Sequence, residues 1–257
     1  MGAHEDLRSL VAGGAGSGAR ASGAPRGTSA AEAWTDLPAE EGSAPRRAAA
    51  VLVLFGVLDA VPARRGGSDG AAPVAADLDV LLLERASSLR AHAGEVAFPG
   101  GRLDPEDAGA VAAALREARE ETGLDTDGVE VLGELAPLPL PVSNHLVTPV
   151  LAWWASPGPV RVVDPGESAA VFRVPVADLL DPANRRTWVL DAPAAASVLP
   201  GRRPPARAVR RARRRGPAFV VGDVLVWGFT AHVLDSLFDA LGWTEPWDRG
   251  RTVDVLR

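Results

Sequence analysis

Short apolar runs rich in valine and leucine recur between residues 49 and 227, and few segments carry a helical pattern. Runs of this length and composition are typical of buried strands. We predict strands at residues 51–55, 79–83, 94–98, 129–132, 147–154, 160–163, 170–174, 219–221 and 224–227. Mixed strands with one helix near the middle and one at the end indicate an α+β fold, specifically an α/β/α sandwich with a mixed β-sheet.

The first long helix is predicted at residues 110–121, because apolar residues recur there at spacings of three and four. Asp107 is its expected N-cap, and Gly123 is its expected C-terminal stop. A short helix is predicted at residues 176–180 and a final helix at residues 230–241.

The chain divides into three parts by composition. Residues 1–46 are rich in Gly, Ala, Ser, Pro and Arg without a sustained period, so we predict a disordered low-complexity tail. Residues 47–245 form the expected folded domain, and residues 246–257 form a C-terminal extension.

Composition excludes several classes of function. There is no cysteine, which rules out disulfides, thiolate metal sites and cysteine nucleophiles. The net charge of −6 argues against a general nucleic-acid surface. The longest apolar run, residues 48–58, is shorter than the ~18 residues of a membrane span, and the N-terminus lacks the features of a secretory signal. We therefore expect a cytoplasmic protein with no membrane association.

Three glutamates on the predicted helix carry the strongest chemical signal. Glu117 precedes Glu120 and Glu121 by three and four residues, so the three carboxylates can converge. Such a group of oxygen ligands suits a hard divalent cation. The alternative is a solvated helix face on which Arg116 and Glu120 form an ordinary ion pair. The upstream pair Gly100–Gly101 favours the metal interpretation, since glycine lets the backbone approach a metal–phosphate complex closely.

This segment resembles the Nudix box, G-x5-E-x7-R-E-U-x-E-E-x-G-U, where U is a bulky apolar residue. From Gly101 the chain reads five residues, Asp107, eight residues and then REAREETGL at residues 116–124. Asp107 replaces a glutamate, one extra residue precedes Arg116, and Ala118 replaces a larger apolar residue. These departures are similar to the usual spelling in the coenzyme A diphosphatase-like branch of the Nudix hydrolases.

The resemblance to that branch extends over roughly residues 49–242. The matching blocks are LLLER at 81–85, LRAHAGEVAFPGG at 89–101, VTPV at 147–150 and WGFTA at 227–231. Glu84 and Ala86 depart from the Thr and Ser that the branch normally carries, which leaves the details of substrate contact open.

The resemblance implies Mg²⁺ or Mn²⁺ as cofactor, a Nudix-type sandwich and a role for each site residue. The implied metal ligands are Glu117, Glu120 and Glu121, and Glu120 is also an implied catalytic residue. Arg116 would pair with these carboxylates and hold their geometry. Glu167 matches the downstream acid of the branch and is either the general base or an ordinary turn residue.

The same resemblance implies a substrate-binding group. Its members are Arg85, Arg90, His92, Gly100 and Gly101. Arginine suits bidentate contacts to phosphate, and coenzyme A carries a 3′-phosphate as well as its diphosphate. A solvent loop is the alternative for Arg90 and His92. His145 and His232 are expected to be structural.

The arginine-rich segment at residues 202–215 contains eight arginines and lies between predicted strands. No aromatic residues alternate with them, so nucleic-acid binding is disfavoured. We expect a solvated loop, with attraction of a polyanionic substrate as an intermediate hypothesis.

The resemblance implies metal-dependent hydrolysis of the diphosphate bond of coenzyme A or a derivative, giving 3′,5′-ADP and 4′-phosphopantetheine or its derivative. The partner is then a small nucleotide substrate, and a homodimer is one possible assembly. Alternatives are hydrolysis of ADP-ribose or a dinucleotide, and a non-catalytic nucleotide-sensing module. The presence of all three glutamates favours catalysis.

Overall fold

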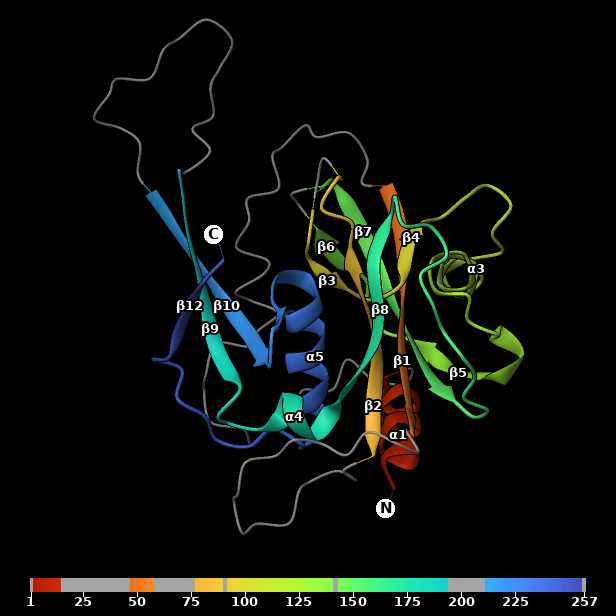
Figure 1. Ribbon diagram of the computed structural model, residues 1–257. Helices are drawn as coiled ribbons and strands as arrows, with labels where there is room; N and C mark the ends of the chain where they lie inside the picture. The colour runs from red at the N-terminus through yellow and green to blue at the C-terminus, as the bar shows by residue number, and fades with distance from the viewer. Residues whose placement is uncertain are drawn as a thin grey trace, which may run out of the picture.

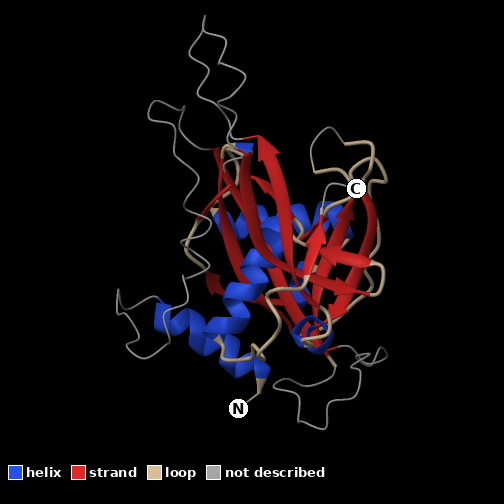
Figure 2. Cartoon of the chain, turned by 90° about the vertical axis from the view of Figure 1, so that its left-hand side faces the viewer, coloured by secondary structure: helices blue, strands red, loops and turns tan. Residues whose placement is uncertain are grey.

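The computed structural model describes residues 2–14, 47–57, 77–89, 92–140, 143–193 and 211–255. In that part of the chain, no helix is long and apolar enough to cross a membrane. The strands form two sheets. One helix lies between the two sheets, and another lies on the outer face of the larger sheet (Figure 1). A view at right angles shows the helices lying against the strands (Figure 2).

The larger sheet is mixed and has eight strands. Its central path is β3-β2-β1-β7-β5, with β4 beside β1, β6 beside β7 and β8 beside β2. The strands are β1 (Arg47–Val57), β2 (Leu78–Arg85), β3 (Val96–Ala97), β4 (Gly100–Arg102), β5 (Val129–Glu134), β6 (Leu138–Leu140), β7 (His145–Trp154) and β8 (Ser168–Pro175). Only β1 and β7 pair in parallel within this sheet as described, which makes it mixed as expected.

Helices cover both faces of this sheet. The helix α3 (Ala110–Thr122) packs on one face through its alanines, against leucines of β1 and β2. On the other face lie α1 (Ala3–Gly14), α4 (Val176–Leu180) and α5 (Gly228–Ala240), which share one hydrophobic core with β1 and β2. The expected α/β/α sandwich is confirmed.

A second sheet lies beyond α5, in the order β11-β10-β9-β12. Its strands are β9 (Arg185–Pro193), β10 (Arg211–Val221), β11 (Val224–Val226) and β12 (Thr252–Asp254). Phe219 and Val226 extend the core around α5 to this sheet. The strands predicted at residues 219–221 and 224–227 are present and pair antiparallel, whereas β9 and β12 were not predicted.

The structure corrects several expectations of local structure. Residues 3–14 form helix α1 within the tail predicted to be disordered, and Leu7 of this helix is fully buried. Residues 211–215, expected in a loop, lie in strand β10, while residues 202–210 fall outside the described part.

The strand predicted at residues 160–163 is absent. The backbone N–H of Arg161 donates to the carbonyl of Thr122 at 2.9 Å, so the segment bonds to the end of α3 instead. The C-terminal carbonyls of a helix lack partners within the helix and accept such donors.

Candidate active site

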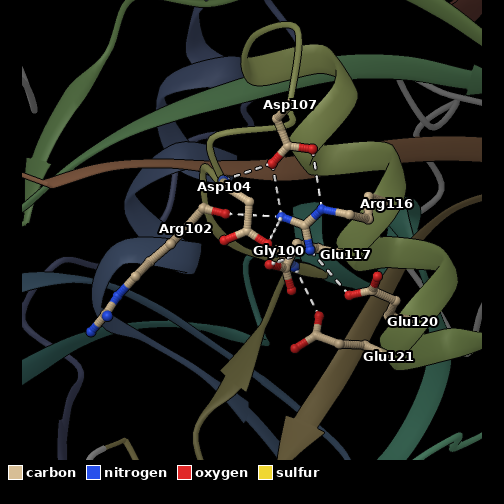
Figure 3. Close-up of polar contacts among 8 residues, drawn as sticks. All are labelled: Gly100, Arg102, Asp104, Asp107, Arg116, Glu117, Glu120 and Glu121. Carbon is tan, nitrogen blue, oxygen red and sulfur yellow. Dashed lines mark hydrogen bonds and ion pairs between the residues drawn. The ribbon is translucent and has the colours of Figure 1, made fainter.

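Helix α3 positions the three carboxylates (Figure 3). Its buried residues Ala113, Ala114 and Ala118 have small side chains, so the helix can lie close to the sheet. Gly123 ends the helix in the left-handed conformation, and its N–H donates to the carbonyl of Arg119 at 2.9 Å, as the sequence predicted. The carboxylate cluster, defined as Glu117, Glu120 and Glu121, therefore lies beside β4.

The two glycines of β4 make this approach possible. Gly100 and Gly101 pair with Val51 and Ala50 of β1, respectively. The Gly100 N–H donates to Oε2 of Glu121 at 2.9 Å. A Cβ on Gly101 would lie only 2.5 Å from the carboxyl carbon of Glu117, so a larger residue would displace that carboxylate.

Arg116 links the cluster to the loop before the helix. Its Nη1 donates to Glu117 at 3.0 Å and to Glu120 at 3.1 Å. Its Nε and Nη2 donate to the two carboxylate oxygens of Asp107 at 3.1 and 2.9 Å, and Nη2 also donates to the Arg102 carbonyl. With these contacts the guanidinium is fully engaged, which suits a residue that holds the cluster in place.

Asp107 is not the N-cap of α3, contrary to the sequence prediction. Gly109 occupies that position, without a capping side-chain bond. The Asp107 carboxylate instead anchors Arg116 and accepts the Asp104 N–H at 2.8 Å. These hydrogen bonds lower the pKa of Asp107, so it remains charged opposite Arg116.

Burial disfavours the ionised form of Glu117 and Glu121. It raises the pKa of Glu121 to about 7, a shift opposed by the Gly100 N–H and increased by the charge of Glu117. Burial also raises the pKa of Glu117, against the effect of Arg116. A bound cation would relieve both effects, since an opposite charge favours the ionised form.

The donor set fits a hard cation, although the side chains do not yet enclose one. Among the described residues, no three Asp, Glu or His side chains are placed to hold a metal ion. The partners explain this, because Arg116 binds Glu117 and Glu120 while Gly100 binds Glu121. Mg²⁺ needs only one or two carboxylates when waters and substrate phosphates complete its shell.

Two further predicted site residues lie near Glu121. The charge of Arg85, the last residue of β2, lowers the pKa of Glu121, and the charge of Glu167 raises it. Glu167 directly precedes β8, and its carbonyl accepts the Ala86 N–H at 2.9 Å. The structure thus brings the C-terminal end of β2 and the N-terminal end of β8 to the same region as the carboxylate cluster.

The remaining predicted residues differ in their surroundings. His92 pairs through Nδ1 with Glu95 Oε2 at 2.8 Å, which raises the pKa of its imidazole. Arg90 lies outside the described residues. His145 contacts Ser143 Oγ at 2.8 Å, and His232 is buried in α5.

Two features were not predicted from the sequence: Ser168, and the pairing of Asp107 with Arg116. The signal for the pairing was the place of Asp107 in the motif, where it replaces a glutamate. Ser168 follows Glu167 and is 1% exposed, but a serine at a strand start carries no distinctive pattern.

Comparisons with known proteins match part of the chain to Nudix proteins. Residues 66–192 match the NUDIX domain model. The chain is 46% identical over 101 residues to a protein of Photorhabdus laumondii described as an uncharacterized Nudix hydrolase NudL, covering 39% of this chain and 53% of the relative. The same identity over the same length holds for NudL of Escherichia coli K12, with 39% and 52% covered. The chain spans about half the length of these curated relatives.

A solved structure also matches. It is a Nudix hydrolase from M. smegmatis, RenU, with 26% identity, a TM-score of 0.37, and coverage of 51% of this chain and 71% of that chain.

Proposed function

The chain contains a Nudix domain, and on that premise we propose that it is a metal-dependent hydrolase of a diphosphate bond in coenzyme A or a derivative. The observation that carries the proposal is the carboxylate cluster, held by Arg116 against the glycines of β4. On a merely solvated helix face, neither three carboxylates around Arg116 nor the close approach of Glu117 to Gly101 would be needed.

Glu117, Glu120 and Glu121 would hold Mg²⁺ or Mn²⁺ through their carboxylate oxygens. The bound metal supplies neutralisation of the diphosphate charge and acidification of a water molecule. Arg116 keeps the carboxylates oriented through Asp107. Because the carboxylates are already oriented, they need to rearrange less during the reaction.

Glu167 is proposed as the general base. Its loop lies beside the end of β2, and its charge acts on Glu121. Glu167 would accept a proton from the attacking water while the new bond to phosphorus forms and the bridging oxygen leaves with the second phosphate.

The preference for coenzyme A rests on the sequence blocks at residues 81–101, 147–150 and 227–231. The first of these blocks supplies the end of β2 and the two glycines, both of which lie at the cluster. We propose Arg85, His92 and Arg90 as contacts to the substrate, in the same block.

The test is hydrolysis of coenzyme A with Mg²⁺ and then Mn²⁺, with products resolved by chromatography. We expect 3′,5′-ADP, and its release should be abolished by a chelator and by Glu121→Gln. Glu134→Gln is the matched control, since Glu134 is exposed at the end of β5. Turnover of ADP-ribose or a dinucleotide alone would refute the coenzyme A assignment, and no turnover of any of them would leave the nucleotide-sensing module as the better account.

A further inference from the structure

Ser168 and Arg85 face each other at the edge of the site. They are partners in the antiparallel pairing of β8 with β2, and the register shifts between Glu84 and Arg85. Because Glu84 pairs with Ala170 and Arg85 pairs with Ser168, one extra residue is accommodated in β8. Irregularities of this kind redirect side chains and are common beside active sites.

Both side chains carry a buried polar atom without a partner. The hydroxyl of Ser168 and the Nε of Arg85 are buried and make no hydrogen bond within the described part of the chain. Ser168 is 1% exposed as a whole residue. Leaving such atoms unsatisfied is costly, and side chains directly opposite on an antiparallel pair have Cβ atoms ~4.5–5.5 Å apart. The Arg85 Nε–H is a donor and the Ser168 hydroxyl is an acceptor, so the two atoms are complementary.

The pair faces the carboxylate cluster. Leu81 lies in the core under α3, and side chains on a strand alternate, so Arg85 points to the same face of the sheet. The effect of Arg85 on the pKa of Glu121 agrees with this placement.

Arg85 and Arg116 differ in the side-chain partners of their guanidinium groups. Arg116 donates to Asp107, Glu117 and Glu120, whereas no hydrogen bond or ion pair joins Arg85 to another side chain in the described ranges. The terminal nitrogens of Arg85 are therefore available for an anionic ligand, for which a guanidinium fork is well suited.

We propose that Ser168 is a positioning residue that accepts the Arg85 Nε–H and so orients the guanidinium toward an anionic oxygen of the bound diphosphate. This inference rests on the proposed function of the same site. A hydrogen bond between the two would satisfy both buried atoms. The terminal nitrogens of Arg85 then stay in a fixed plane, so less side-chain entropy is lost when the ligand binds.

The test is a double-mutant cycle of Ser168→Ala and Arg85→Lys with two readouts. These are the KM and kcat of metal-dependent hydrolysis, and the Kd of inorganic pyrophosphate by calorimetry. We expect Ser168→Ala to raise KM and the pyrophosphate Kd about tenfold and to change kcat less than twofold, the effect of one hydrogen bond to a charged group. Ser168→Thr keeps a hydroxyl and should stay within twofold of the wild type.

Arg85→Lys removes the Nε–H, so adding Ser168→Ala to it should cause no further loss. Ser156→Ala is the matched control, because Ser156 is exposed. Additive losses in the double variant, or wild-type values for Ser168→Ala in both readouts, would overturn the positioning role. If no substrate is hydrolysed but pyrophosphate binding still follows the expected cycle, the positioning role stands and the hydrolase proposal fails.

Discussion

The close contact between Gly101 and Glu117 gives the sharpest test of the site. In Gly101→Ala the new Cβ would lie 2.5 Å from the Glu117 carboxyl carbon, whereas ordinary contacts begin near 3.4 Å. Glu117 must therefore move by the difference, 3.4 − 2.5, or about 0.9 Å. A displacement of ~1 Å in a reacting group can cost roughly 10²-fold in rate, so we expect kcat to fall by about that factor.

The fold should survive this change. The atoms that the new methyl group meets lie at the end of a flexible side chain, and the backbone of Gly101 is not in the left-handed region. Replacing glycine by alanine at such a position changes stability by less than ~1 kcal/mol, often favourably. In Gly100→Ala, by contrast, the Cβ would lie 2.3 Å from the Ala50 carbonyl oxygen, so that variant should lose stability as well as activity.

The assay combines steady-state kinetics on the diphosphate substrate with denaturant unfolding of each variant. Gly158→Ala is the matched control, because a Cβ there meets nothing within 4 Å. Wild-type kcat for a folded Gly101→Ala enzyme would show that the position of Glu117 does not matter to the reaction. That result would remove Glu117 from the metal site and weaken the assignment of the whole cluster.

Two further predictions separate the base from the metal ligands. Glu167→Gln should lower kcat by ~10²–10⁴-fold with little change in the apparent Mg²⁺ affinity, and unchanged turnover would exclude Glu167 as the base. The pKa of about 7 for Glu121 predicts a pH-dependent metal affinity, because a cation binds the deprotonated carboxylate. Below this pKa the proton competes, so Mg²⁺ affinity should fall up to about tenfold per pH unit and level off above it. Metal titrations from pH 5.5 to 8.5 would show this, and a constant affinity across that range would contradict the assignment of Glu121 as a ligand.

The sequence predicted the elements whose signals are local. Strand β1 is an unbroken apolar run after Arg47, and α3 has a regular apolar spacing with a terminal glycine, so both were located to within a few residues. The carboxylates of α3 could be placed together for the same reason, since helical spacing alone brings Glu117 beside Glu120 and Glu121.

Helix α1 and strand β12 were not predicted, for different reasons. Helix α1 does carry a local signal, because Leu7, Leu10 and Val11 recur at spacings of three and four, but the glycine-rich composition of the surrounding segment outweighed it. Leu7 is fully buried in the main core. Strand β12 has three residues and exists through its parallel pairing with β9, a partnership that leaves no pattern in the local sequence.

The position of Asp107 shows how a local rule can give the wrong role to the right residue. Aspartate is a preferred N-cap residue, and that rule predicted a hydrogen bond from the helix backbone to Asp107, although the helix begins three residues later. The same carboxylate lies within reach of Arg116, and a bidentate pair with a guanidinium is stronger than a bond to a neutral N–H. Arg116 also binds Glu117 and Glu120, so its single positive charge is shared among three carboxylates. Asp107 therefore fixes the orientation of Arg116, and through it the geometry of the carboxylate cluster, which no cap of α3 could do.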